Sequence, residues 1–134
     1  MGSLEDVTEK FIKQNNIQRI VNCIYGRLGT VHKMEVDVEI RYIPLKDTKK
    51  QNIIDAILTF CKIMEGTGKR TLIYCHSGES RAPSVVLGYL MKKQSYILRD
   101  AIEYVKKRRS VINPKKFMSQ LRMFEKSILN GNYK

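Results

Sequence analysis

The sequence lacks long apolar runs, clustered cysteines and low-complexity segments. No stretch of eighteen apolar residues occurs in its 134 residues, so we expect no membrane span. No apolar segment follows the charged N-terminal residues, so we expect no signal peptide either. Cys23, Cys61 and Cys75 are odd in number and widely spaced, which suits neither a disulfide framework nor a zinc knuckle. This cysteine pattern favours reduced intracellular thiols. Because the two histidines, His32 and His76, also lie far apart, we expect no structural metal site, and we expect no cofactor.

Acidic residues are scarce relative to basic ones. The chain has 25 Lys and Arg against 13 Asp and Glu, a formal net charge of +12. Such a field favours anionic partners, namely phosphorylated proteins, nucleic acid or an acidic membrane, but a solvated basic surface explains the excess equally well. The length suits one domain, residues 1–134. We expect a cytoplasmic monomer, because no apolar heptad seam is evident, with the nucleus as an open alternative.

Apolar patterning predicts alternating strands and helices. Strands are expected at 17–24, 36–42 and 70–74, and helices after caps at Ser3 and Asn52, after Arg81, and around Leu98–Val105 and Phe117–Ile128. A polar loop is expected from Tyr25 to Lys33, and Pro44 is expected to end the second strand. The helix that follows Asn52 is expected to end at Gly66-Thr67-Gly68. This alternation predicts an α/β domain in which helices flank a sheet.

The most informative stretch is residues 73–83, which read strand, tight loop, helix. A loop that opens a helix directs backbone N–H groups toward one spot, where the helix dipole also favours an anion. Gly78 permits a positive φ or a close backbone approach in mid-loop. Ser80 could cap the helix, and Pro83 suits its first turn. The segment therefore predicts an anion-binding loop.

Cys75 and Arg81 bracket this loop. A helix N-terminus and a nearby cation favour the thiolate, which is the nucleophilic form of cysteine. The guanidinium of Arg81 can hold two phosphate oxygens at once during an in-line displacement. Attack on phosphorus would give a covalent intermediate that water hydrolyses, and the leaving oxygen needs a general acid. We assign that role to Asp47, which lies among Lys46, Lys49 and Lys50 on a loop after a strand.

Both assignments have plainer alternatives. Cys75 could be a buried, inert thiol, and an Asp between Pro and Lys residues is ordinary in a turn. The loop between a strand and an apolar helix is what favours chemistry at Cys75. A sulfurtransferase of the rhodanese type also places cysteine in an anion loop, so the loop alone leaves that activity open.

Beyond the loop, the sequence resembles the small dual-specificity protein phosphatases along nearly its whole length. The family's signature, His-Cys, five residues, Arg and Ser/Thr, is similar to residues 74–82, which read Tyr74-Cys75-His76-Ser77-Gly78-Glu79-Ser80-Arg81-Ala82. Further similarity lies in Gly2–Val7, Ile17–Cys23, Tyr42–Asp47, Leu87–Met91 and Asn113–Leu121, and only the family's short first strand has no counterpart.

The resemblance implies a phosphatase-like three-layer fold with a central mixed, mostly parallel sheet. It implies that Cys75 is the nucleophile, Arg81 the phosphate clamp and Asp47 the acid. Substrate phosphate would bind to His76, Ser77, Gly78, Glu79, Ser80 and Arg81. The substrates would be phosphotyrosine and phosphoserine or phosphothreonine in proteins, without a metal.

Three residues depart from the family pattern. Tyr74 stands at the position of a histidine that orders the loop, and Ala82 at that of a hydroxyl that supports the leaving thiolate. Glu79 adds a negative charge to the pocket, which disfavours highly anionic lipid headgroups. These departures leave a phospho-binding pseudophosphatase as the main alternative. An RNA 5′-phosphatase is less favoured and no nucleic-acid partner is expected, because no aromatic stacking platform is evident.

Overall fold

The computed structural model describes residues 1–3, 7–26, 37–66, 68–109 and 112–133. Its strands are β1 (Arg19–Ile24), β2 (Glu39–Leu45) and β3 (Thr71–Tyr74). Its helices are α1 (Glu9–Gln14), α2 (Ile53–Met64), α3 (Arg81–Lys93), α4 (Leu98–Arg108), the 3-10 turn η3 (Lys115–Phe117) and α5 (Met118–Leu129). The predicted alternation of strands and helices, and with it the α/β class, is confirmed.

The strands of the described residues form one parallel sheet in the order β2-β1-β3. The central strand β1 is buried along its whole length, as its apolar sequence predicts. Where a mixed, mostly parallel sheet was expected, the described strands are all parallel. Because the strands run the same way, their carboxyl ends meet at one edge of the sheet, where ligands of open α/β sheets bind.

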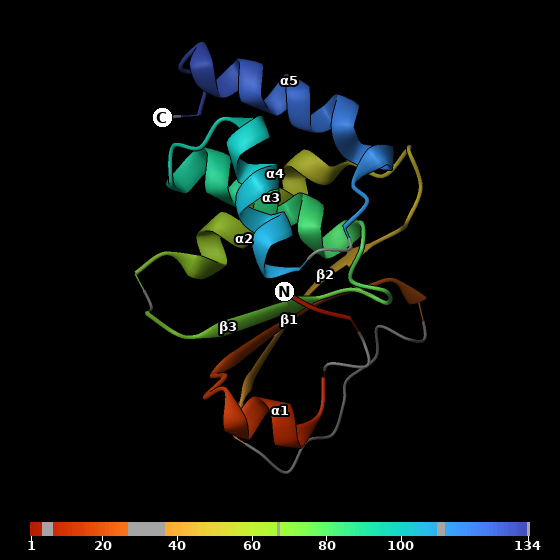
Figure 1. The fold of residues 1–134 in the computed structure, drawn as a ribbon, viewed down its shortest axis with the longest axis vertical. Coiled ribbons are helices and arrows are strands. Elements are labelled where there is room, and N and C mark those ends of the chain that lie inside the picture. The colour runs from red at the N-terminus through yellow and green to blue at the C-terminus, as the bar shows by residue number, and fades with distance from the viewer. Residues whose placement is uncertain (4–6, 27–36, 67, 110–111, 134) are drawn as a thin grey trace.

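The sheet separates two helical layers (Figure 1), with α1 on one face and α2 to α5 on the other. Successive side chains of a strand point to opposite faces. Tyr74 therefore packs with Ile12 of α1, whereas Ile73 and Cys75 belong to the larger core beneath α2 to α5. The three-layer arrangement implied by the resemblance is present, and the nucleophile candidate faces the thicker layer.

One predicted boundary lies outside the described residues, and another is wrong. The predicted helix start after Ser3 falls on residues 4–6, outside the described part of the chain. The described helix α1 begins at Glu9, and Thr8 supplies its cap: Oγ1 of Thr8 accepts a hydrogen bond from the N–H of Phe11 at 3.1 Å. Pro44 does not end the second strand but lies inside β2. It is tolerated there because β2 is at the edge of the described sheet and its register with β1 shifts nearby.

Other local predictions are confirmed. Asn52 caps α2, and its Oδ1 accepts a hydrogen bond from the N–H of Asp55 at 3.2 Å. The helix ends at Met64, just before the two glycines. Most of the predicted loop from Tyr25 to Lys33, and Val36 at the start of the predicted second strand, lie outside the described residues.

The N-terminal residues lie beside β3. Gly2 forms a single parallel bridge with Tyr74: its N–H donates to the carbonyl of Ile73 at 2.8 Å, and its carbonyl accepts from the N–H of Cys75 at 3.3 Å. Gly2 fixes the backbone at the point where β3 passes into the Cys75 loop.

Replacing Gly88 by alanine is expected to destabilise the protein by about 1–3 kcal/mol. Gly88 lies on α3, where an added Cβ would fall 2.5 Å from Cγ1 and 2.7 Å from Cγ2 of the fully buried Ile57. Ile57 is branched at Cβ and packed on all sides, so it cannot turn away. Thermal unfolding followed by circular dichroism measures the effect. In the Gly88→Ala/Ile57→Ala double variant, where the overlapping carbons are absent, the loss should be smaller than the sum of the two single losses, whereas a fully additive loss would contradict the overlap.

Candidate active site

The candidate site lies at the carboxyl edge of the parallel sheet. Cys75 follows β3 directly, and Asp47 stands two residues after β2. These two residues are 28 positions apart in sequence, and only the parallel arrangement brings their strand ends to the same edge. The loop of residues 75–81, called the Cys75 loop below, connects β3 to the N-terminus of α3.

The Cys75 loop has the backbone geometry that its sequence predicts. Gly78 has a φ of +77°, and an added Cβ would lie 2.5 Å from Nη2 of Arg109 and 2.9 Å from the carbonyl carbon of Gly2. Both expectations for this glycine, positive φ and close approach, are confirmed. Within the described part of the chain, the backbone N–H groups of His76 and Ser80 have no hydrogen-bond partner. The loop therefore presents donors suited to an anion.

Cys75 is only 1% exposed, yet it differs from an inert core thiol. The backbone N–H of Ala82, in the first turn of α3, points to its Sγ at 3.4 Å. A sulfur atom that accepts this amide hydrogen bond at the N-terminus of a 13-residue helix lies where a negative charge is stabilised. The position of Cys75 is thus compatible with its predicted role as a nucleophile.

Arg81 links the Cys75 loop to the end of β2. Its Nη1 donates a hydrogen bond to the carbonyl of Leu45 at 2.9 Å. This contact fixes the guanidinium beside the segment that carries Asp47. The other N–H groups of the guanidinium have no partner in the described ranges and could bind an anion. The structure thereby brings Arg81 to the same edge as Cys75 and Asp47.

Asp47 is exposed and forms an ion pair that sequence reasoning missed. Nζ of Lys116, in η3, lies 3.2 Å from Oδ2 of Asp47 and donates to the carbonyl oxygen of Asp47 at 3.1 Å. Both side chains are partly solvated, at 39% and 45% exposure, so the pair stabilises the fold by less than about 1 kcal/mol. The pair matters for the position of Asp47, because it connects η3 to the loop that carries this general-acid candidate.

The other predicted ligand residues are divided between solvent and core. His76, Ser77 and Glu79 are exposed, whereas Gly78 and Ser80 are buried. Ser80 occupies the N-cap position of α3, as predicted, but its side chain makes no capping hydrogen bond, and its Oγ has no partner among the described residues. The carbonyl of Ser80 instead accepts bonds from the N–H and Oγ of Ser84, at 3.0 and 2.6 Å.

Two residues that brace the Cys75 loop also escaped sequence analysis. Nη2 of Arg109, at the end of α4, donates to the carbonyl of Ser77 at 3.1 Å. The N–H of Asn113 donates to the carbonyl of Glu79 at 2.5 Å. In sequence Arg109 is one residue of a basic run, so nothing marked it as a contact of a loop 32 residues earlier.

Burial raises the pKa of two groups near Cys75. Desolvation raises the pKa of the Cys23 thiol, the charge of Cys75 raises it further, and Arg81 lowers it. Cys23 therefore stays neutral beside Cys75. Burial also raises the pKa of the Tyr74 hydroxyl, with smaller contributions from Tyr42 and Cys23. Because Tyr74 packs toward α1, its side chain lies on the face of the sheet opposite to Cys75.

No cluster of three or more His, Cys, Asp or Glu side chains suited to a metal ion occurs among the described residues. None of the described helices is long and apolar enough to cross a membrane.

Comparison with known proteins gives concordant matches. Residues 1–127 match the family model described as "Dual specificity phosphatase, catalytic domain". The chain is 36% identical over 93 residues to dual specificity protein phosphatase 5 of Rattus norvegicus, covering 66% of this chain and 24% of the relative. It is 40% identical over 92 residues to dual specificity protein phosphatase 4 of Gallus gallus, with 65% and 24% covered. The chain thus spans about a quarter of the length of these relatives.

Among solved structures, human DUSP28 superposes with a TM-score of 0.85 at 23% identity, covering 98% of this chain and 92% of that one. At this identity the likeness concerns the fold, and it agrees with a parallel sheet between helical layers.

Proposed function

Because the chain belongs to the dual-specificity phosphatase family, we propose that it hydrolyses phosphotyrosine and phosphoserine or phosphothreonine in proteins through a cysteinyl-phosphate intermediate. One observation supports this most directly: the N–H of Ala82 meets the Cys75 sulfur at the head of a loop with unused backbone donors. The same field that favours a thiolate there also favours a bound phosphate.

In the first step the thiolate of Cys75 attacks phosphorus. The S–P bond forms as the P–O bond to the substrate breaks, and Asp47 gives its proton to the leaving oxygen. Arg81 and the loop N–H groups hold the three equatorial oxygens, where negative charge is spread in the transition state. In the second step water attacks phosphorus, Asp47 takes a proton from it, and the thiolate of Cys75 leaves.

A phospho-binding module with little catalysis is the second candidate, but it is not favoured. Tyr74, Ala82 and Glu79 motivate it, because all three depart from the family pattern. Ala82 nevertheless supports the sulfur through its backbone N–H, a contact that any side chain at this position allows. Tyr74 faces the opposite side of the sheet from Cys75. The nucleophile and the phosphate clamp are both present, which supports catalysis over mere binding.

We further propose that residues 1–134 act as one domain, as a monomer, in the cytoplasm, with the nucleus as the open alternative. The described cysteines are all free thiols, which suits a reducing compartment. Phosphorylated proteins are the proposed partners. An RNA 5′-phosphatase is less favoured, since the matched relatives are named as protein phosphatases.

A burst-phase assay with p-nitrophenyl phosphate, in the presence of a metal chelator, tests this function. Wild-type protein should release about one equivalent of nitrophenol rapidly and then turn over more slowly, as a covalent intermediate accumulates. Phosphotyrosine and phosphothreonine peptides should release inorganic phosphate under the same conditions. If vanadate binds but neither burst nor turnover occurs, the binding module becomes the better description.

Replacing Ala82 by serine should accelerate the slow phase of that assay by about tenfold, while the burst changes little. A hydroxyl at this position, whose backbone N–H already meets the Cys75 sulfur, can stabilise the departing thiolate in the second step. The variant isolates the second step because the first step forms the S–P bond and needs no such support. An unchanged slow phase would mean that hydrolysis of the intermediate is limited elsewhere.

A further inference from the structure

Two lysine-bearing segments meet next to the Cys75 loop. Lys46, Lys49 and Lys50 follow β2, and Lys115 and Lys116 open η3. We call these five residues the lysine rim. The sequence separates its two parts by 64 residues, so their convergence is a property of the tertiary structure alone.

Hydrogen bonds hold the two parts of the lysine rim together. Lys116 contacts both the carboxylate and the carbonyl of Asp47. The side chain of Gln120, in α5, donates to the carbonyl of Gln51 and accepts from the N–H of Ile53, each at 2.7 Å. Gln51 in turn accepts from the N–H of Lys46 through its Oε1, at 2.9 Å. The loop after β2 and the C-terminal segment thus form one surface.

The same surface is joined to the catalytic machinery at two points. Arg81 donates to the carbonyl of Leu45, the residue before Lys46. Asn113, two residues before Lys115, donates to the carbonyl of Glu79. A phosphorylated residue bound in the Cys75 loop would therefore bring its neighbouring residues over or beside the lysine rim.

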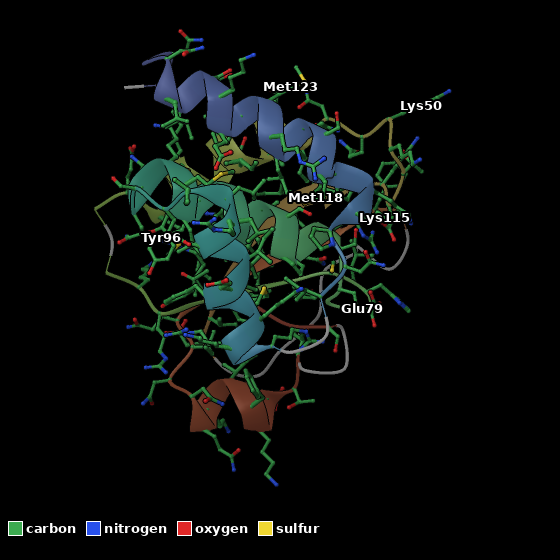
Figure 2. All side chains as sticks on the ribbon, turned by 45° about the horizontal axis from the view of Figure 1, so that its top comes forward. Lys50, Glu79, Tyr96, Lys115, Met118 and Met123 are labelled. Carbon is green, nitrogen blue, oxygen red and sulfur yellow. The ribbon has the colours of Figure 1, made fainter. Side chains whose placement is uncertain are left out.

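The charge of the lysine rim is largely uncompensated. All five lysines are exposed. Among the described residues, no carboxylate forms an ion pair with Lys46, Lys49, Lys50 or Lys115. Asp47 balances Lys116 alone. Lys46 is further held over the ring of Tyr25, 4.9 Å from its centroid. Figure 2 shows Lys50, Lys115 and Glu79 on the same side of the molecule, with Lys50 extending into solvent.

We propose that the lysine rim binds anionic groups flanking the phosphorylated residue, so that the preferred substrates are phosphoproteins with acidic residues next to the phosphorylated residue. The inference rests on the proposed function. Several like charges beside a site raise the local concentration of an anionic ligand and speed its association, an effect that salt weakens. Carboxylates and a second phosphorylated residue offer the same chemistry, so the experiment includes both.

The experiment compares three phosphotyrosine peptides that differ only in the residues next to the phosphotyrosine. These residues are Glu in the first peptide, Gln in the second, and one phosphoserine with Gln at the other positions in the third. At low salt the wild type should show a kcat/KM about tenfold higher for the Glu peptide than for the Gln peptide. At about 0.5 M salt, which screens exposed charges, this ratio should approach one. A phosphoserine arm that alone exceeds the Gln peptide would identify a second phosphate as the bound anion.

The diagnostic variant is Lys49→Glu/Lys115→Glu, with one substitution in each part of the lysine rim. It should reduce the ratio between Glu and Gln peptides to about one or below, because it replaces attraction by repulsion at two exposed sites. The matched control is Lys10→Glu/Lys13→Glu on α1, across the sheet, which changes the net charge equally and should keep the wild-type ratio. Equal ratios in both variants would overturn the inference.

The test also separates this inference from the proposed function. The same peptide ratio is measured as a dissociation constant on Cys75→Ser protein by fluorescence anisotropy, which needs no turnover. Turnover with a wild-type ratio near one would refute the lysine rim and leave the phosphatase intact. If the protein binds the Glu peptide more tightly than the Gln peptide but turns over neither, the lysine rim is supported and the proposed phosphatase function is refuted. Displacement of the Glu peptide by a single-stranded RNA at a tenfold lower concentration would show that the surface serves RNA, and would overturn the proposal.

Discussion

Replacing Cys75 by serine is expected to abolish turnover of p-nitrophenyl phosphate, with a loss on the order of 10⁴-fold or more. A serine hydroxyl fits the space of the thiol but does not ionise near neutral pH, so the helix N-terminus and the Ala82 N–H have no anionic nucleophile to stabilise. The first chemical step is therefore lost, and with it the burst. Steady-state and stopped-flow kinetics on the purified variant measure both quantities.

The fold should survive this change. The Cys75→Ser variant is expected to unfold within a few degrees of wild type and to bind vanadate, because the loop backbone and Arg81 remain in place. Cys61→Ser is the matched control: Cys61 is also a buried free thiol, but it lies on α2. It should keep most of the activity. Equal activity in wild type and Cys75→Ser would refute the cysteinyl-phosphate mechanism.

Replacing Asp47 by asparagine is expected to reduce kcat by about 10²–10⁴-fold for substrates with poor leaving groups, such as phenyl phosphate or phosphoserine peptides. An amide keeps the shape of the side chain but has no proton to give to the leaving oxygen. For p-nitrophenyl phosphate, whose leaving group needs little help, the loss should be much smaller. A series of aryl phosphates of increasing leaving-group pKa therefore gives a steeper dependence for the variant than for the wild type.

Loss of the contact with Lys116 cannot account for such an effect. An exposed ion pair of this kind contributes less than about 1 kcal/mol, or roughly fivefold, whereas a loss of 10²–10⁴-fold corresponds to about 3–5 kcal/mol. Asp100→Asn is the control, because Asp100 is an exposed carboxylate on α4 that also lies near a basic side chain. If Asp47→Asn lowers kcat equally for substrates with good and with poor leaving groups, Asp47 is not the general acid.

Local chemistry explains why much of the site could be predicted. The Cys75 loop lies between a strand and a helix within eleven consecutive residues, so its proposed nucleophile, its glycine and its arginine could be picked out from short-range patterns. Gly78 is a clear example, since its positive φ is confirmed. Ser80 is the exception: serine is a common cap, but here its hydroxyl is buried without forming the capping bond.

The features that local patterns did not predict depend on the sheet. Thr8 caps α1, and Ile12 of that helix packs against the sheet, whereas the predicted helix start after Ser3 lies outside the described residues. Pro44 is compatible with a strand only because β2 is at the edge of the described sheet, which the residues around Pro44 do not reveal. Arg19 is 2% exposed on the central strand, where it donates to Glu39 and to the carbonyl of Ile63. A charged residue in that position is not expected from pattern alone.

The sequence by itself determined the α/β class and the Cys75 loop, because periodicity and loop chemistry depend on neighbouring residues. The roles assigned to Cys75, Arg81 and Asp47 also come from the sequence and stay predictions. Only the tertiary structure decided what surrounds them: Arg109 and Asn113 against the Cys75 loop, Lys116 on Asp47, and the joining of two distant segments into the lysine rim. Those contacts depend on how helices pack across the sheet, and a basic residue on a solvated face has the same sequence signature as one that touches the site.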